Sequence, residues 1–315
     1  MPVTTGRRAG IDVGGTKCLG VVWQNGQVLH EVRRDTPEGA DEIIHALVSI
    51  VGELGDVESV GVGVPGLVTR QGVLRAAPNL VDIADFAVGP LLRDVLHCDV
   101  AVENDVTCAA VAEWSVGAAQ GVDDVVVVTL GTGIGGGLVS GGKLVRGTNG
   151  FAGEIGHMVI DPSGPACVCG QRGCWERYAS GNGLAYLGAL AAEKGSAERV
   201  KQIAGSTDQI RGEHIREAAL EGDQQALEII DDFARWVALG LSNLTNLLDP
   251  AMIVIGGGLA GSGDLFLDPI QRWFGELLYS PNLRPHPKLV LATFGEQAGA
   301  IGAALLAQYA HVSDI

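Results

Sequence analysis

The chain has 315 residues, of which 47% are hydrophobic, and its formal net charge is −16. This length suggests two domains with ample apolar content for buried cores, and the acidic balance argues against a surface that binds nucleic acid or polyphosphate. Apolar runs stay shorter than the about 20 residues that span a bilayer, and the N-terminus lacks an apolar signal core. We therefore expect a cytoplasmic protein that binds neither nucleic acid nor membrane.

The first predicted element is an apolar strand at 9–13, and the turn Gly14-Gly15-Thr16-Lys17 joins it to a second strand at 19–23. Backbone N–H groups of such a turn can approach phosphate oxygens closely. Asp12, at the strand end, could hold Mg²⁺ directly or through water. A plain hairpin turn explains the same residues, and the Walker pattern G-x-x-x-x-G-K-[ST] does not occur in the chain.

The motif Glu103-Asn104-Asp105 follows a short strand at 100–102 and precedes a helix at 108–116. Phosphoryl transfer to a hydroxyl requires a carboxylate that orients the alcohol and takes its proton, which makes Asp105 the candidate base. From the residues alone, a helix N-cap formed by Asn104 or Asp105 is the simpler interpretation. Earlier in the chain, helices are expected at 41–51 and 89–96, and a strand at 57–64.

A second strand–glycine turn–strand unit runs from 125 to 145, with Gly131-Thr132-Gly133 at its first turn. Read as G-x-G-x-x-G, the turn could indicate a dinucleotide site, but a hairpin rather than a helix follows it, so we reject that interpretation. Thr132 and Gly133 can instead hold the β- and γ-phosphates of ATP. The two glycine hairpins form a weak internal repeat.

Three cysteines, Cys167, Cys169 and Cys174, follow His157 at short spacing. Thiolates and imidazole suit zinc in a closed tetrahedral site. The acids Glu154 and Glu176 bracket this cluster, and carboxylates can accept hydrogen bonds from neighbouring sugar hydroxyls. Zinc would then fix the sugar carboxylates and not the phosphate loops, which lie elsewhere in the chain. The alternative is three ordinary thiols and an unrelated histidine, and a disulfide is less consistent with a chain that lacks a secretory signal.

The remaining predicted elements belong to the C-terminal part of the chain. Apolar residues spaced by three and four predict a long helix at 224–248 that ends before Pro250. A buried strand at 252–255 leads into Gly256-Gly257-Gly258, which could be a helix cap or a ligand loop. The other expected elements are helices at 185–195, 214–220 and 296–308 and a strand at 289–292.

The motif G-E-I-G-H at 153–157, followed by C-x-C-G-x-x-G-C-x-E at 167–176, resembles the signature of the ROK family of bacterial sugar kinases and repressors. The resemblance covers nearly the whole chain and is greatest to the ATP-dependent glucokinases. It implies an α/β, actin-like (ribonuclease H-like) phosphotransferase fold, with two α/β domains around a central cleft. The implied domains are a small one, 1–108 plus about 299–315, and a large one, 109–298, which carries the zinc-binding loop.

The resemblance also implies a function, the phosphorylation of glucose to glucose 6-phosphate by ATP with Asp105 as general base, and it favours this role over the helix cap. The implied sugar contacts are Gly66, Asn79, Asn104, Asp105, Glu154, His157 and Glu176. The implied residues for ATP and Mg²⁺ are Asp12, Gly14, Gly15, Thr16, Lys17, Thr132, Gly133 and, on the adenosine side, Gly256, Gly257 and Gly258. Structural Zn²⁺ would be held by His157, Cys167, Cys169 and Cys174, with the second ring nitrogen of His157 free to touch the sugar.

Some alternatives stay open within the resemblance. The hexose could be fructose, mannose, allose or N-acetylmannosamine, because Thr107 and Cys108 depart from the commoner family form. A ROK repressor is expected to carry a winged helix-turn-helix ahead of the first phosphate loop, whereas Asp12 is the twelfth residue here. A non-catalytic sugar sensor is disfavoured because both glycine turns and Asp105 are present. A homo-oligomer, dimer or tetramer, is expected.

Overall fold

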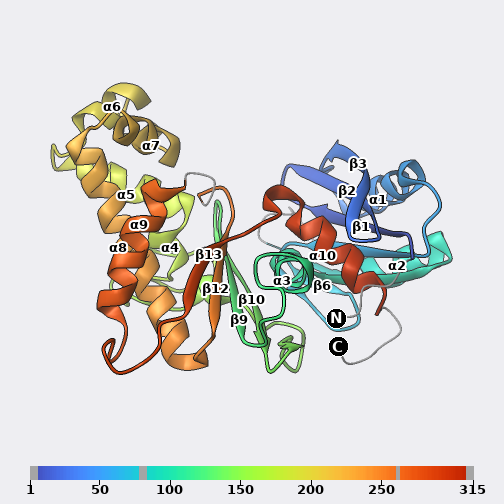
Figure 1. Cartoon of the computed structure of the whole chain (residues 1–315). Coiled ribbons are helices and arrows are strands. Elements are labelled where there is room, and N and C mark those ends of the chain that lie inside the picture. The colour runs from blue at the N-terminus through green and yellow to red at the C-terminus, as the bar shows by residue number, and fades with distance from the viewer. Residues whose placement is uncertain (1–5, 78–83, 260–262, 310–315) are drawn as a thin grey trace. The chain divides into compact units, whose positions relative to one another are not determined.

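The computed structural model describes residues 6–77, 84–259 and 263–309 (Figure 1). Its contacts divide the chain into two compact units. The first comprises Met1–Val127, Gly136–Gly153 and Ala292–Ile315, and the second comprises Val128–Gly135 and Glu154–Leu291. The domain limits implied by the family resemblance, 1–108 with about 299–315 and 109–298, stay a prediction.

The first unit contains a five-stranded sheet of order β3-β2-β1-β4-β8. Its strands are β1 (Arg8–Val13), β2 (Lys17–Gln24), β3 (Gln27–Asp35), β4 (Ser59–Val64) and β8 (Asp99–Asn104). β1, β2 and β3 pair antiparallel, whereas β4 is parallel to both β1 and β8. The register places Asp12 opposite Gly63, and Gly63 opposite Glu103. Because the carboxyl ends of parallel strands share one edge, Asp12 and the Glu103-Asn104-Asp105 motif lie at the same edge of this sheet.

The helices of the first unit are α1 (Ala40–Leu54), α2 (Val88–Leu96), α3 (Asp105–Val116) and α10 (Ala298–Ala307), with the 3₁₀ turn η4 (Gly295–Gln297) before α10. A small antiparallel sheet consists of β5 (Leu67–Val68), β6 (Leu74–Ala76) and β7 (Ala84–Phe86). α10 is buried along its whole length and packs on α3, β1 and β4. The close approach of α10 to β4 requires small residues, because a Cβ on Gly61 would lie 1.8 Å from the carbonyl oxygen of Ala303.

The second sheet repeats the arrangement of the first, with the order β11-β10-β9-β12-β13. Its strands are β9 (Val125–Leu130), β10 (Ile134–Ser140), β11 (Lys143–Leu144), β12 (Met252–Gly256) and β13 (Lys288–Leu291). In each sheet a consecutive three-strand meander occupies one side and two later strands, parallel to each other, occupy the other side. The duplication of glycine hairpins predicted from the sequence is therefore confirmed.

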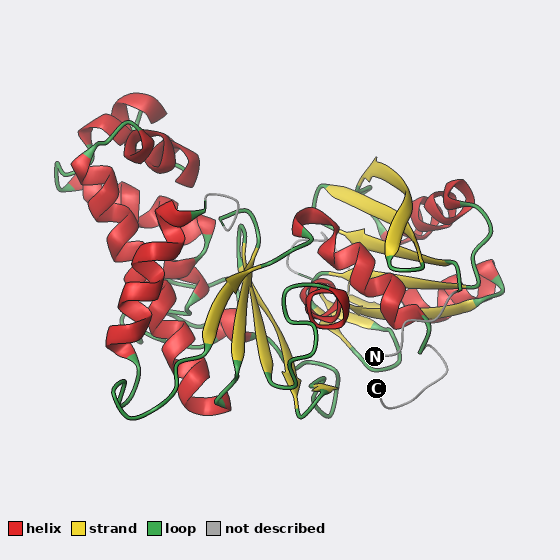
Figure 2. Ribbon diagram, in the orientation of Figure 1, coloured by secondary structure: helices red, strands yellow, loops and turns green. Residues whose placement is uncertain are grey.

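Helices fill the rest of the second unit, as the red ribbons of Figure 2 show. They are α4 (Glu176–Ala179), α5 (Gly181–Glu193), α6 (Glu198–Ala204), α7 (Gly212–Leu220), α8 (Gln224–Leu248) and α9 (Asp264–Leu277), with 3₁₀ turns η1 (Ile155–His157) and η2 (Thr207–Gln209). α8 has the predicted bounds, because Asp223 caps its start and Asp249 adopts a left-handed φ of 45° before Pro250. Leu248, expected on the buried face, is 40% exposed because it lies at the helix end.

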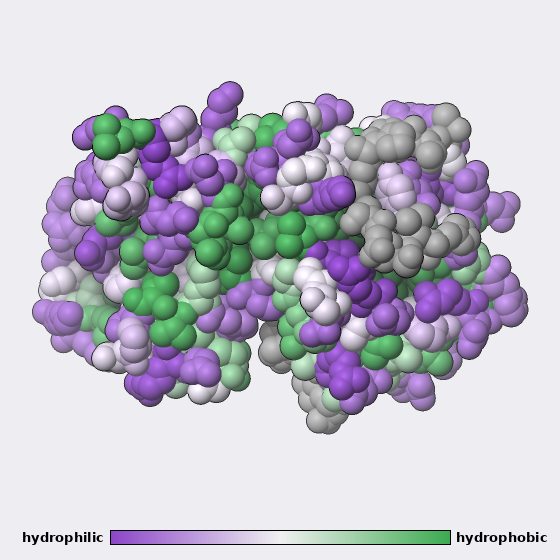
Figure 3. Space-filling view, turned by 90° about the horizontal axis from the view of Figure 1, so that it is seen from below, coloured by the Kyte–Doolittle hydropathy of each residue, from purple (hydrophilic) through white to green (hydrophobic). Residues whose placement is uncertain are grey.

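The surface agrees with the acidic, mixed composition. Figure 3 shows one face, on which hydrophilic and hydrophobic residues are interspersed. Of the helices in the part of the chain that the structure describes, none has the length and apolar character required to cross a bilayer.

Candidate active site

The first glycine turn is a closed hairpin between β1 and β2. The N–H of Gly14 donates to the carbonyl oxygen of Lys17 at 2.8 Å, and the Thr36 hydroxyl donates to the carbonyl oxygen of Gly14 at 2.7 Å. Gly15, Thr16 and Lys17 are exposed. These two hydrogen bonds hold the turn in place, and its tip is exposed to solvent, which suits contact with a phosphate.

Asp12 lies beside this turn in an unusual electrostatic environment. Burial, reinforced by the nearby Asp105 carboxylate, raises the pKa of Asp12 to about 7. Its Oδ1 is enclosed and has no hydrogen-bond partner among the described residues. Gly299 packs directly on the carboxylate, where a Cβ would lie 2.6 Å from Asp12 Cγ. An enclosed carboxylate oxygen without a donor, close to a second carboxylate, fits a hard cation such as Mg²⁺.

The Glu103-Asn104-Asp105 motif forms the junction of β8 and α3. The helix cap and the candidate base, the two interpretations of this motif, fall on different residues. Asn104 is the N-cap, because its Oδ1 accepts from the N–H of Thr107 at 3.0 Å. Asp105 is the first residue of α3, three residues earlier than the predicted helix start, and its Oδ1 accepts from the N–H of Val106 at 2.9 Å. The helix therefore fixes Asp105 without using it as the cap.

Two predicted sugar contacts are joined by a hydrogen bond. Asn104 Nδ2 donates to the carbonyl oxygen of Gly66 at 3.2 Å. Gly66 has a φ of 100°, and a Cβ there would lie 2.1 Å from the carbonyl oxygen of Ala76. Glycine is thus required at this position. Asn79, also predicted to contact sugar, lies outside the described residues.

Glu103, the first residue of this motif, forms an ion pair with Arg146 that no sequence pattern indicates. Arg146 Nε lies 2.5 Å from Glu103 Oε2, and the two side chains are 12% and 5% exposed. Glu103 Oε1 accepts from the N–H of Asn104 at 3.0 Å. Burial raises the pKa of Glu103, and Arg146 opposes this shift. Arg70 Nη2 donates to the carbonyl oxygen of Gly147 at 2.8 Å, so a second arginine holds the same loop. The scarcity of cations in an acidic chain is the one sequence signal that could have drawn attention to these arginines.

In the second unit, the four predicted metal ligands come together. The ligand atoms of His157, Cys167, Cys169 and Cys174 all lie within 4.8 Å of one another. His157 Nδ1 is 3.6 Å from Cys167 Sγ, and Cys169 Sγ is 3.5 Å from Cys174 Sγ. Sulfurs that share a tetrahedral zinc at about 2.3 Å lie about 3.8 Å apart. The donor set and its spacing therefore fit a structural zinc ion.

His157 faces two ways. Its Nδ1 points to the thiols, while its Nε2 lies 4.0 Å from Glu154 Oε2. Burial raises the pKa of Glu154, the nearby His157 lowers it, and Glu176 raises it. Glu154, His157 and Glu176 thus form one polar group beside the cysteine cluster.

Glu176 also contacts the second glycine turn, so the cysteine loop adjoins one of the two predicted phosphate turns. Glu176 Oε2 accepts from the N–H of Ile134 at 3.0 Å. A Cβ on Gly133 would lie 2.3 Å from the same oxygen. The two segments are distant in sequence but in contact, because α4 begins at Glu176, directly after the cysteine loop.

A cavity of about 950 Å³ is lined in part by this turn, through Gly131 and Thr132. Thr132 and Gly258, both predicted to bind ATP, line the same cavity. Gly257 has a structural role instead: its φ is 85°, and a Cβ would lie 2.5 Å from the carbonyl oxygen of Leu130. Gly256 is the buried last residue of β12. Of the third glycine motif, Gly258 is therefore the residue that faces the cavity.

Most polar residues of the cavity were not predicted. They come from α5, η2 and α7 and the segments around them: Asn182, Asp208, Gln209, Arg211, Glu213, His214 and Arg216. All but Asn182 lie within 208–216, a polar stretch that matches no recognised ligand motif.

Comparison with known proteins identifies the family. The ROK family model matches residues 8–310. A glucokinase of Streptomyces coelicolor is 39% identical over 96% of this chain and 98% of its own. An N-acetylmannosamine kinase of Escherichia fergusonii is 33% identical over 95% and 97% of the two chains. The crystal structure of a ROK glucokinase from Streptomyces griseus, in complex with glucose and AMPPNP, superposes with a TM-score of 0.86 at 40% identity, and covers 96% of this chain and 99% of that one.

These matches extend over both units and both glycine hairpins, and they confirm the predicted actin-like α/β fold. The chain belongs to the ROK family.

Proposed function

We propose that this chain is a hexose kinase that transfers the γ-phosphoryl group of ATP to the 6-hydroxyl of glucose, giving glucose 6-phosphate and ADP. The observation that carries the proposal is the closeness of Asp12 and Asp105 at the carboxyl edge of the first sheet: a Cβ on Gly63 would lie 3.5 Å from Asp12 Oδ1 and 3.3 Å from the Cα of Asp105, and Asp105 helps to raise the pKa of Asp12. Asp12 suits the binding of a cation, and Asp105 suits the role of a general base. The similarity to Streptomyces glucokinases over nearly the whole chain supports this activity.

Asp105 is proposed as the general base. As the 6-hydroxyl oxygen attacks the γ-phosphorus, a P–O bond forms, the bond to the bridging oxygen breaks, and the hydroxyl proton passes to Asp105. ADP leaves with the electron pair. The N–H of Val106 donates to Asp105 Oδ1 and so fixes the carboxylate at the start of α3.

Asp12 would hold Mg²⁺, directly or through water. The ion supplies positive charge that offsets the negative charge of the phosphates. The backbone N–H groups of the two glycine turns would approach the phosphates, with Thr132 and Gly133 on the second turn. The cavity beside Thr132 and Gly258 would receive the adenosine. The proposed nucleotide residues are Asp12, Gly14, Gly15, Thr16, Lys17, Thr132, Gly133 and Gly256–Gly258.

The proposed hexose residues are Gly66, Asn79, Asn104, Glu154, His157 and Glu176. We propose structural zinc on His157, Cys167, Cys169 and Cys174, supported by the fit of the four ligand atoms to one centre. Zinc bound through Nδ1 of His157 leaves Nε2 on the side of Glu154, where a sugar hydroxyl could reach it.

We also propose that the chain forms a homo-oligomer. Leu247, Tyr279 and Leu283 are 76%, 74% and 88% exposed in the second unit. A surface on which several such side chains adjoin is one that another protein can cover, whereas single exposed ones are common on any protein. Light scattering after size-exclusion chromatography should give the mass of two or four chains, and the mass of one chain at micromolar concentration would contradict this.

The test of the function is a panel assay. ATP is supplied with glucose, fructose, mannose, allose or N-acetylmannosamine, and ADP release is followed by a coupled reaction. We expect the highest kcat/KM with glucose. A higher kcat/KM with N-acetylmannosamine would instead favour an N-acetylmannosamine kinase, the activity for which the relative from Escherichia fergusonii is named. ADP release no faster with any hexose than without one would contradict the function.

A further inference from the structure

The second glycine turn is held at both ends by the segment that follows the cysteine loop. At one end, the N–H of Gly181 donates to the carbonyl oxygen of Gly131 at 2.7 Å. At the other, the N–H of Ile134 donates to Glu176 Oε2 at 3.0 Å. The first contact is between backbone groups, so its geometry is set by the fold. The second depends on one side chain, and its strength can change with the state of that side chain.

Glu176 is placed to take part in two interactions at once. Its carboxylate lies directly against the last residue of the turn, where a Cβ on Gly133 would come within 2.3 Å of Oε2. A carboxylate has about four acceptor positions, and the N–H of Ile134 uses one of them. The others can accept hydrogen bonds from a ligand while the contact with the turn is kept.

We propose that Glu176 is a positioning residue that couples hexose binding to nucleotide binding. The inference rests on the proposed function, in which Glu176 accepts a hydrogen bond from the hexose and the turn at 131–133 contacts the phosphates. A hexose hydroxyl that donates to Glu176 fixes its rotamer. The fixed carboxylate in turn orders the N–H of Ile134 and the turn before it, so the nucleotide pays less ordering entropy on binding.

The coupling is positive and reciprocal. Each ligand should raise the affinity for the other by the same factor, because both use one thermodynamic cycle. The neighbouring Glu154 provides a matched comparison. It belongs to the same polar group and is proposed to bind the same sugar, but its carboxylate lies against His157 rather than against the turn.

The experiment measures the affinity of a non-hydrolysable ATP analogue by calorimetry, with and without saturating glucose. The ratio of the two dissociation constants is the coupling factor. We expect about fivefold or more for the wild-type protein, within the usual range for coupled sites. Glu176→Ala should reduce the factor to about one. Glu154→Gln should weaken glucose by about tenfold or more and, once glucose is saturating, leave the coupling factor within twofold of the wild-type value.

Glu176→Gln separates coupling from general damage to the fold. The amide oxygen can still accept from Ile134, so part of the coupling should return while the charge is absent. Glu176→Ala with a wild-type coupling factor, or a wild-type factor of one in a protein that phosphorylates glucose, would overturn the inference. A wild-type protein that forms no ADP with glucose would overturn the proposed function as well, so the two failures are distinguishable.

Discussion

At the scale of single residues, Asp105 is the first to test. Asp105→Asn keeps the size of the side chain but cannot accept the hydroxyl proton. We expect kcat to fall by ~10²–10⁴ through loss of general-base catalysis. Because Asn104, not Asp105, caps α3, the helix and the affinity for glucose should be retained. Steady-state kinetics and calorimetry check both parts, and near-normal turnover would contradict the assignment.

Asp12 makes a prediction about pH. Its pKa is raised from 3.8 to about 7 in the folded protein, so the folded state binds the proton more tightly than the unfolded chain. Its contribution to the free energy of unfolding is therefore greatest below about pH 4 and is lost progressively as the pH rises to about 7. Between pH 5 and 7.5 the loss is about 2–3 kcal/mol, at 1.36 kcal/mol for each pKa unit.

The measurement compares wild-type protein with Asp12→Asn, which cannot titrate, in magnesium-free buffer. Urea unfolding at each pH gives both free energies, and their difference isolates Asp12 from other titrating groups. The wild type should lose stability relative to the variant as the pH rises. A difference that stays constant from pH 5 to 7.5 would show that the Asp12 pKa is not raised.

The buried pair of Glu103 and Arg146 predicts a large cost when one partner is removed. Arg146→Gln leaves a carboxylate that is 5% exposed without its counter-charge, and the free energy of unfolding should fall by about 3–5 kcal/mol. Adding Glu103→Gln to that variant should recover much of the loss, because the unpaired charge is then gone. Urea unfolding of the two single variants and the double variant provides the test, and additive losses would contradict it.

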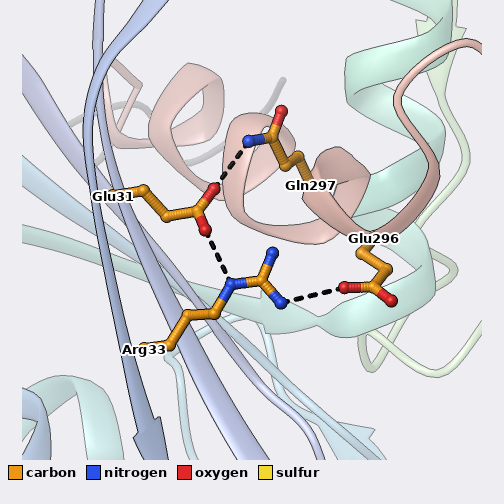
Figure 4. A network of polar contacts seen from close by, with 4 residues as sticks. All are labelled: Glu31, Arg33, Glu296 and Gln297. Atoms are coloured by element: carbon orange, nitrogen blue, oxygen red, sulfur yellow. Dashed lines mark hydrogen bonds and ion pairs between the residues drawn. The ribbon is translucent and has the colours of Figure 1, made fainter.

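An exposed network in the same unit provides the control (Figure 4). Arg33 donates to Glu31 at 2.6 Å and to Glu296 at 3.0 Å, and Gln297 Nε2 donates to Glu31 at 2.7 Å. The side chains of Arg33 and Glu296 are 50% and 81% exposed. Arg33→Gln should therefore change the free energy of unfolding far less than Arg146→Gln does, because solvent screens the exposed pair.

At this scale, the sequence predicts residues that belong to a motif and misses those that act through a partner. Asp12 and Asp105 stand at strand ends, and their closeness follows from the parallel pairing of β1, β4 and β8. Arg146 lies in an irregular loop after β11, where no periodicity indicates which way a side chain points. Its pairing with Glu103 is set by tertiary packing alone.

At the scale of elements, the second glycine turn makes a prediction that the sequence alone would have stated differently. If Gly133 only held phosphates, as the sequence predicts, a substitution there would weaken ATP and spare glucose. The structure places Glu176 where the new Cβ would be, so the side chain of Glu176 must move. Gly133→Ala should therefore weaken both the ATP analogue and glucose, the latter by about tenfold through loss of a charged hydrogen bond.

Gly131→Ala is the matched control in the same turn. The nearest atom to a Cβ at Gly131 is 4.0 Å away, so no neighbour has to move. Calorimetry without nucleotide should show wild-type glucose affinity for Gly131→Ala and reduced affinity for Gly133→Ala. Equal glucose affinities for the two variants would mean that Glu176 does not bind sugar or does not depend on this turn.

Helices with clear periodicity were predictable, and those with mixed signals were not. The sequence places α8 correctly because its apolar spacing, its Asp223 cap and its Pro250 stop all agree. It misses α9, in which Pro269 interrupts an otherwise amphipathic segment. The strands of the small sheet, β5 to β7, have two or three residues each, too short for an alternating pattern to appear.

At the scale of the whole molecule, the duplicated hairpins predicted the repeated sheet order, because each glycine turn connects two strands that must pair. The sequence could not predict that the cysteine loop supports the second glycine turn. Cys174 is followed by Trp175, which is fully buried and donates through Nε1 to the carbonyl oxygen of Trp236 at 2.8 Å. This anchor fixes the start of α4, and Glu176 is thereby aimed at Ile134.

The contacts from the cysteine loop to the second glycine turn predict that the proposed zinc ion affects the binding of both glucose and ATP. Cys169→Ser removes one of four zinc ligands, and structural zinc contributes directly to local folding. We expect wild-type protein to contain about one zinc per chain and the variant to contain much less. Disorder of the loop should then displace Glu176, so that affinity falls for glucose and for the ATP analogue alike, on the order of tenfold. Cys98→Ser, at a half-buried thiol outside the cluster, should keep both the zinc and the affinities. Metal analysis, circular dichroism and calorimetry on the two variants provide the test. A zinc-free protein that stays folded and binds both ligands normally would show that His157, Cys167, Cys169 and Cys174 do not form a structural zinc site.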